Sequence, residues 1–93
     1  MTPMERLHAY MLELRDLYRV ARVGIFGSVA RGEATDTSDV DILVEFSDHP
    51  DLFQFVRLQE RLSKILGREV DLVTPDALKP LIKDRVLREV RYV

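Results

Sequence analysis

The sequence predicts an α/β fold of the α+β kind, in which helices flank a small three-stranded sheet in two layers. Two observations lead to this prediction. Apolar residues recur at helical spacing in some segments and gather in short β-rich runs in three others. These segments alternate as helix, strand, helix, strand, helix, strand and helix, without an internal repeat or a low-complexity linker. We expect one domain over residues 1–93.

The first part of the chain is predicted to form a helix, a strand and a second, shorter helix. Apolar side chains at steps of three and four indicate an amphipathic helix over residues 4–18. A β-rich run indicates a strand over residues 20–26, and Gly27 then allows the backbone to turn sharply. Residues 28–31 have room for one short helix, with Ser28 as its cap and Gly32 at its end.

A second strand is predicted over residues 39–46, after a polar loop at 33–38. Alternate side chains of a strand point to opposite faces of its sheet. One face of this strand is therefore apolar and the other acidic: Val40, Ile42 and Val44 against Asp39 and Asp41.

The second half of the chain is predicted to hold a helix, a strand and a last helix. The first of these helices is expected to start at His49-Pro50-Asp51, with proline in the first position, and to end at Gly67. Its apolar side would carry Leu52, Phe55, Val56, Leu62, Ile65 and Leu66. A strand follows over residues 69–73. Thr74-Pro75 would open the last helix, whose apolar residues are Leu78, Leu81, Ile82, Val86 and Val90.

Composition excludes several classes of protein. The absence of cysteine rules out disulfides and thiol catalysis, and a formal charge of −2 gives no general attraction to nucleic acid. The apolar run at residues 40–44 is interrupted by Asp41, whereas a membrane span needs about 20 apolar residues. Residues 1–6 lack the pattern of a secretory signal, so we expect a cytoplasmic protein without membrane contact.

Gly27 and Ser28 are candidates for binding phosphate. They stand between a strand and a helix, where free backbone N–H groups and a hydroxyl converge. The alternative is an ordinary turn, in which Gly-Ser is common. A P-loop is excluded, because Glu33-Ala34 stands where lysine and a hydroxyl residue would be required.

Three aspartates are candidates for binding metal. Asp39 and Asp41 lie two residues apart, which places their carboxylates about 6.6 Å apart on one face, a spacing that fits a Mg²⁺ pair. The alternative is a solvated pair in a loop, but this pair runs directly into the apolar residues 42–44. Asp71 stands between Val70 and Leu72, and it can reach the same ions if the third strand lies beside the second.

These motifs resemble those of a known family. Gly27-Ser28, followed after ten residues by Asp39-Val40-Asp41, resembles the signature of the nucleotidyltransferase superfamily that shares the DNA polymerase β palm. The resemblance implies that the three-stranded sheet is mixed. The longer strings at residues 26–34 and 38–44 resemble its minimal nucleotidyltransferases, the MNT proteins paired with HEPN toxins.

The resemblance implies a role for each of these residues. Gly27 and Ser28 would hold a triphosphate, and Asp39 and Asp41 would bind two Mg²⁺ ions. Asp71 would ligate one ion and help to activate the acceptor hydroxyl. Arg31, which falls in the family's Ala-Arg-Gly stretch, would either contact phosphate or orient the loop, and of these we favour the orienting role.

The resemblance also implies a function. The chain would transfer AMP from ATP to a tyrosine hydroxyl of a HEPN toxin, neutralise it, and form a hetero-oligomer with it. Two alternatives remain open: an antitoxin that only covers its toxin, and a nucleotidyltransferase with a small-molecule acceptor.

A row of arginines at 85, 88 and 91 is a further feature of the predicted last helix. Such a row can dock an acidic partner, but a charged row on a helix is usually a solvated face, and we favour this interpretation.

Overall fold

The computed structural model describes all 93 residues, which form five α-helices, one 3₁₀ helix and four strands. In chain order the elements are α1 (Pro3–Ala9), α2 (Met11–Tyr18), β1 (Val20–Phe26), α3 (Gly27–Ala30), β2 (Val40–Phe46), α4 (Leu52–Leu66), β3 (Val70–Val73), η1 (Pro75–Ala77), α5 (Pro80–Glu89) and β4 (Arg91–Tyr92). None of the helices is both long and apolar enough to cross a membrane.

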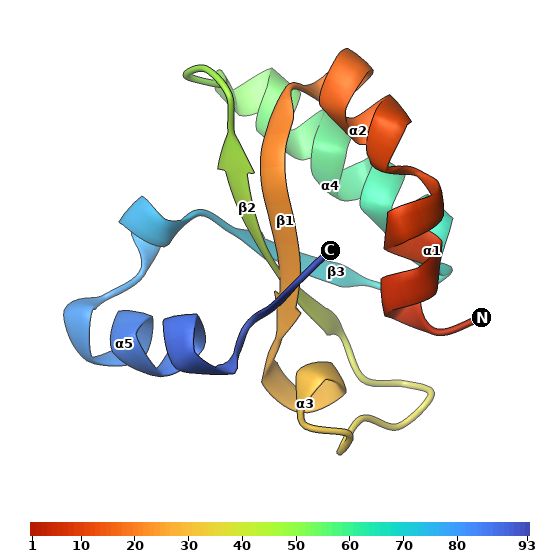
Figure 1. The fold of residues 1–93 in the computed structure, drawn as a ribbon, viewed down its shortest axis with the longest axis vertical. Helices are drawn as coiled ribbons and strands as arrows, with labels where there is room; N and C mark the ends of the chain where they lie inside the picture. The colour runs from red at the N-terminus through yellow and green to blue at the C-terminus, as the bar shows by residue number, and fades with distance from the viewer.

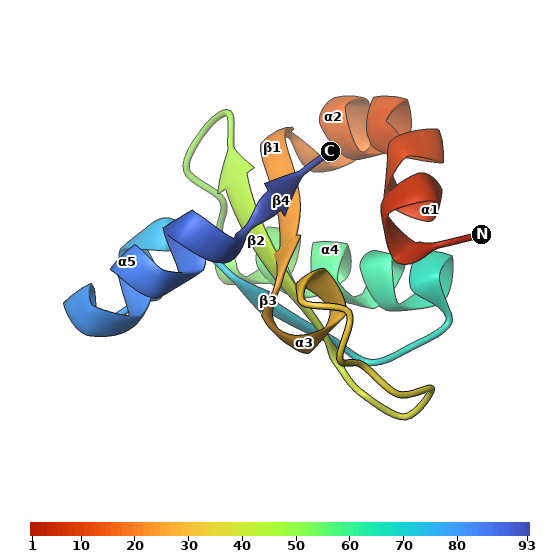
Figure 2. The ribbon, with the colours of Figure 1, turned by 60° about the horizontal axis from the view of Figure 1, so that its bottom comes forward.

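The strands form one mixed sheet in the order β3-β2-β1-β4 (Figures 1 and 2, with β4 labelled in Figure 2). Strand β1 runs antiparallel to both β2 and β4, whereas β2 and β3 are parallel. The predicted fold class is confirmed, but the prediction of three strands was wrong, because β4 adds a fourth. This strand has only two residues, which pair with Gly24 and Ile25 and are too few to produce an alternating pattern.

Helices α1, α2 and α4 gather on one side of the sheet, and α5 lies on the other (Figures 1 and 2). The core lies between these three helices and the sheet. As predicted, β2 turns its apolar face to this core: Val40, Ile42 and Val44 are fully buried there. Strand β2 begins at Val40, so Asp39 directly precedes the strand instead of starting it.

The predicted single helix over residues 4–18 is divided in two. The division falls at Tyr10, whose φ and ψ of −105° and 8° lie outside the helical region. Helix α1 packs against α4, whereas α2 packs against both α4 and β1. The change of direction allows both helices to bury apolar side chains, Leu7 from α1 and Leu14 from α2.

Helix α4 ends at Gly67 as predicted, but it begins later than predicted. Asp51 is its N-cap and exchanges side-chain to backbone hydrogen bonds with Gln54, so Pro50 precedes the helix. The buried stripe consists of Leu58, Leu62, Ile65 and Leu66. The predicted apolar side was therefore wrong at Leu52 and Val56, which are exposed, and lacked Leu58.

The predicted last helix is also divided. Residues 75–77 form only a 3₁₀ turn, and α5 starts at Pro80. Proline disfavours a helical conformation in the residue before it, and Lys79 accordingly has an extended ψ of 147°. Val90 is extended and leads into β4. Leu81 of α5 is 92% exposed, so it is not part of the core.

Candidate active site

The turn between β1 and α3 depends on Gly27. Its φ of 72° lies in the left-handed region that favours glycine. A side chain at this position would also overlap the Asp41 carboxylate, which lies directly against the Gly27 backbone. The predicted sharp turn is confirmed. The helix begins one residue earlier than predicted, with Phe26 as N-cap, so Ser28 lies inside the helix and does not cap it.

Two of the candidate metal ligands are neighbours on adjacent strands. Asp41 of β2 and Asp71 of β3 stand opposite each other in the parallel register. Strand alternation places both on the sheet face opposite the core. Asp41 is half-buried, whereas Asp39 and Asp71 are exposed. The condition on which the role of Asp71 depended, a third strand beside the second, is therefore met.

The acidic groups influence each other's charge. Burial raises the pKa of the Asp41 carboxyl above its ordinary value, and the negative charges of Asp71 and Asp39 raise it further. The positive charge of Arg31 opposes this rise, and the charge of Glu89 adds to it. Negative charge is thus in excess around Asp41, an environment that a cation would stabilise.

These carboxylates are suitable ligands for magnesium by their chemistry. Mg²⁺ binds oxygen ligands and uses one or two carboxylates together with substrate phosphates and water. As placed, the side chains do not converge into a group of three or more acidic or histidine residues that could hold an ion. The donor set therefore fits a metal ion that is held partly by the phosphates of the substrate. It fits a metal ion held by the protein alone less well.

Arg31 and Glu89 add a contact that the sequence did not predict. Glu89, the last residue of α5, forms an ion pair with the Arg31 guanidinium through one carboxylate oxygen. Its other oxygen accepts a hydrogen bond from the Gly27 N–H at 3.4 Å. The hydrogen bond from Arg31 lowers the pKa of Glu89, although burial opposes this, so the carboxylate is held in its charged form. Arg31 also pairs with the exposed Glu33 at 3.0 Å.

A cleft of about 410 Å³ opens between the Gly27 turn and α5. The four predicted residues that it brings together are Gly27, Ser28, Arg31 and Asp41. Asp39 and Asp71 do not line it. Its remaining wall comes from the end of β1 and from α5, with Phe26, Leu81, Ile82, Arg85, Val86 and Glu89. The cleft is thus lined by polar and charged side chains together with apolar ones.

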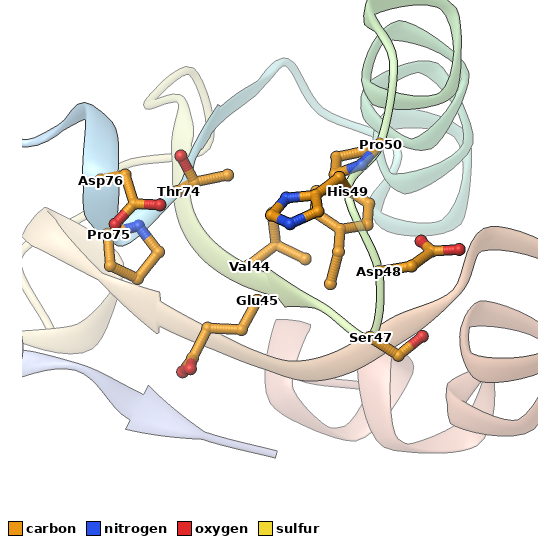
Figure 3. A pocket seen from close by; sticks show the side chains of 10 residues that line it. Val44, Glu45, Ser47, Asp48, His49, Pro50, Thr74, Pro75 and Asp76 are labelled. Carbon is orange, nitrogen blue, oxygen red and sulfur yellow. The ribbon is translucent and has the colours of Figure 1, made fainter.

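A second cleft, of about 440 Å³, lies at the opposite end of β2 (Figure 3). It is lined by residues 44–50 and 74–76 and contains none of the predicted site residues. Glu45 and Asp48 in its wall are paired with Arg22 and Arg19, at 2.6 and 2.9 Å. His49, where the sequence predicts the start of a helix, lies in the loop between β2 and α4.

The predicted row of three arginines on one helix was wrong. Arg85 and Arg88 are on α5, but Arg91 lies in β4, because the chain leaves the helix at Val90. Arg85 lines the cleft beside the Gly27 turn.

The chain is similar to proteins of known class. The family described as "Nucleotidyltransferase domain" matches residues 9–93. Protein adenylyltransferase MntA from Thermococcus cleftensis is 51% identical over 87 residues, which are 94% of this chain and 88% of that protein.

Solved structures agree with this assignment. A minimal nucleotidyltransferase is 41% identical, with a TM-score of 0.78 over 95% of this chain and 93% of that one. A chain of the complex between a tri-AMPylated Shewanella oneidensis HEPN toxin and its MNT antitoxin shares the fold at 22% identity, with a TM-score of 0.68 over 97% of this chain and 70% of that one. The resemblance inferred from the motifs is confirmed: the chain belongs to the nucleotidyltransferase domain family, as a homologue of the protein adenylyltransferase MntA.

Proposed function

We propose that this nucleotidyltransferase moves AMP from ATP to a tyrosine hydroxyl of a HEPN-type partner and thereby acts as its antitoxin. The observation that carries the proposal is the position of Asp41. Its carboxylate lies against the Gly27 turn and stands in register with Asp71, so phosphate donors and acidic groups meet at one point. The similarity to MntA, a protein adenylyltransferase, supports the reaction type. The HEPN complex of a protein with the same fold suggests the partner and a hetero-oligomer.

The Gly27 turn and Arg31 would bind the triphosphate. Gly27 supplies a backbone N–H, a donor to phosphate oxygens, at the turn against which the Asp41 carboxylate lies. Ser28 and Arg31 line the same cleft and supply a hydroxyl and a guanidinium, both good donors to phosphate oxygens.

Asp39, Asp41 and Asp71 would hold two Mg²⁺ ions together with the phosphates of the nucleotide. When bound, these ions would offset the negative charge of the phosphates and favour ionisation of the acceptor hydroxyl. The excess of negative charge around Asp41 supports this assignment.

In the transfer step, the hydroxyl oxygen of the acceptor attacks the α-phosphorus of ATP. A new bond between oxygen and phosphorus forms as the bond to the β-phosphate's bridging oxygen breaks, and pyrophosphate leaves. The proton of the acceptor passes to a carboxylate, a role for which we propose Asp71. Asp71 is exposed, so a side chain from another protein can reach it.

Intact-mass spectrometry tests the proposal. The protein is incubated with its HEPN partner, ATP and Mg²⁺, and each transferred AMP should add about 329 Da to the partner as pyrophosphate is expelled. Asp71→Asn should still bind the partner but transfer poorly. Asp76→Asn is the matched control, because this aspartate is exposed and lines the other cleft. Full neutralisation of the toxin by Asp71→Asn without added mass would instead support an antitoxin that only covers its toxin.

A further inference from the structure

Glu89 occupies two of the phosphate donors that the proposed function needs, the Gly27 N–H and the Arg31 guanidinium. One carboxylate oxygen accepts the Gly27 N–H, and the other pairs with Arg31. The side chain is only 16% exposed, so it lies within the cleft and not on the surface. The carboxylate is thus bound as an anion at the position where an anionic phosphate is expected.

Glu89 and a nucleotide phosphate cannot both use the Gly27 N–H, and they compete for the charge of Arg31. A single N–H group provides one hydrogen bond, and the Glu89 carboxylate already takes it. Its charge also adds to the excess of negative charge around Asp41. A triphosphate that entered beside Glu89 would therefore meet both an occupied donor and a repelling charge.

A second cation near Glu89 offers it another partner. Arg85 lies four residues before Glu89 on α5, a spacing that places both side chains on one side of the helix. The charge of Arg85 already contributes to the lowered pKa of Glu89, and Arg85 lines the same cleft. Arg85 is therefore the cation that Glu89 would meet on the same side of α5 if its side chain turned away from Arg31.

We infer that Glu89 is a built-in competitor of the nucleotide, a deduction that rests on the proposed function. In the free protein Glu89 holds the Gly27 N–H and Arg31. When the triphosphate binds, Glu89 turns to Arg85 and releases Arg31 to the phosphate. The exchange leaves Glu89 with a cationic partner. The affinity for nucleotide is lowered in proportion to the time that Glu89 occupies the site.

Calorimetric titration with ATP in the presence of EDTA tests this inference. Glu89→Gln has the same size but no charge, and it should bind ATP about tenfold more tightly than the wild type, as expected if Glu89 fills the site about nine-tenths of the time. The matched control is Glu33→Gln. Glu33 is the other partner of Arg31, but it is exposed and does not contact Gly27, so its loss should leave the affinity nearly unchanged.

Glu89→Asp provides a second variant if Glu89→Gln does not fold. It keeps the charge, but it is one methylene shorter and cannot hold Gly27 and Arg31 together, so its affinity should lie between those of the wild type and Glu89→Gln. If a folded Glu89 variant binds ATP as weakly as the wild type or more weakly, the inference about Glu89 is overturned, but the proposed function is not. If the variant binds ATP more weakly only in the presence of Mg²⁺, the inference is also overturned, and Glu89 is a metal ligand. If neither wild type nor variants bind ATP under any condition, the proposed function fails as well.

Discussion

Gly27→Ala should damage both the stability and the activity of the protein, for two separable reasons. A residue other than glycine costs about 1–2 kcal/mol at a φ such as the 72° of Gly27. The new methyl group would also lie 3.0 Å from Cγ and 3.3 Å from Cβ of Asp41. Rotation of the carboxylate alone cannot relieve this contact, since Cβ is fixed by the strand. Overpacking of this kind adds about 1–3 kcal/mol.

Gly67→Ala measures the cost of the backbone conformation without the cost of overpacking. Gly67 has a similar φ of 67°, but nothing lies within 4 Å of the position that its methyl group would take. Equilibrium unfolding in urea should therefore show a loss of about 1–2 kcal/mol for Gly67→Ala and a clearly larger loss for Gly27→Ala. In a protein of this size, each kcal/mol lowers the Tm by about 4–8 °C.

The transfer assay completes the comparison. Gly67→Ala should transfer AMP normally at a temperature where it is folded. Gly27→Ala should lose transfer under the same conditions, because the new methyl group displaces the carboxylate of Asp41, a proposed metal ligand. Equal losses of stability in the two variants, with transfer retained by Gly27→Ala, would refute this account of the turn.

Three further predictions concern the fold. Gly24→Ala would place a methyl group against the chain at β4, so the Tm should fall. The Val93 N–H, which donates a hydrogen bond to the Val23 carbonyl of β1, should then lose its protection from hydrogen exchange. Leu62→Ala removes a fully buried side chain and should cost about 2–5 kcal/mol in urea unfolding. The hydrogen bonds from Arg61 lower the pKa of Glu13, so the wild type should be more stable than Glu13→Gln above the ordinary pKa of 4.5. Thermal unfolding should show that this advantage disappears as the pH falls through the lowered pKa.

Local patterns predicted those parts of the site that a few neighbouring residues determine. The alternation in β2 separated Val40, Ile42 and Val44 from Asp41, and the structure places the two sets on opposite faces of the sheet. The need for glycine at position 27 also followed from its place between a strand and a helix. Both features depend on backbone geometry over two or three residues, so the sequence contains them directly.

Contacts between segments that lie far apart in the sequence were harder to predict. The position of Asp71 beside Asp41 could be stated only on the condition that the third strand lies next to the second. Glu89 was missed because its partners Arg31 and Gly27 are 58 and 62 residues away, and no periodicity in α5 marks it. Strand β4 is held by pairing with β1, and its two residues carry no pattern of their own.

The ionisation of Asp41 helps to distinguish an antitoxin that acts as an enzyme from one that only binds and covers its toxin. Because the pKa of Asp41 is raised in the folded chain, its ionised form is less favourable there than in the unfolded chain. This group therefore opposes folding at neutral pH, and the penalty is relieved only as the pH falls through the raised pKa. The exposed Asp71 adds to the penalty while contributing nothing to the core.

Neutral residues at these two positions would remove the repulsion and leave the apolar face of β2 intact. A protein that only covers its partner has no need for this unfavourable arrangement, whereas one that binds Mg²⁺ and phosphate requires it, so the carboxylates favour catalysis.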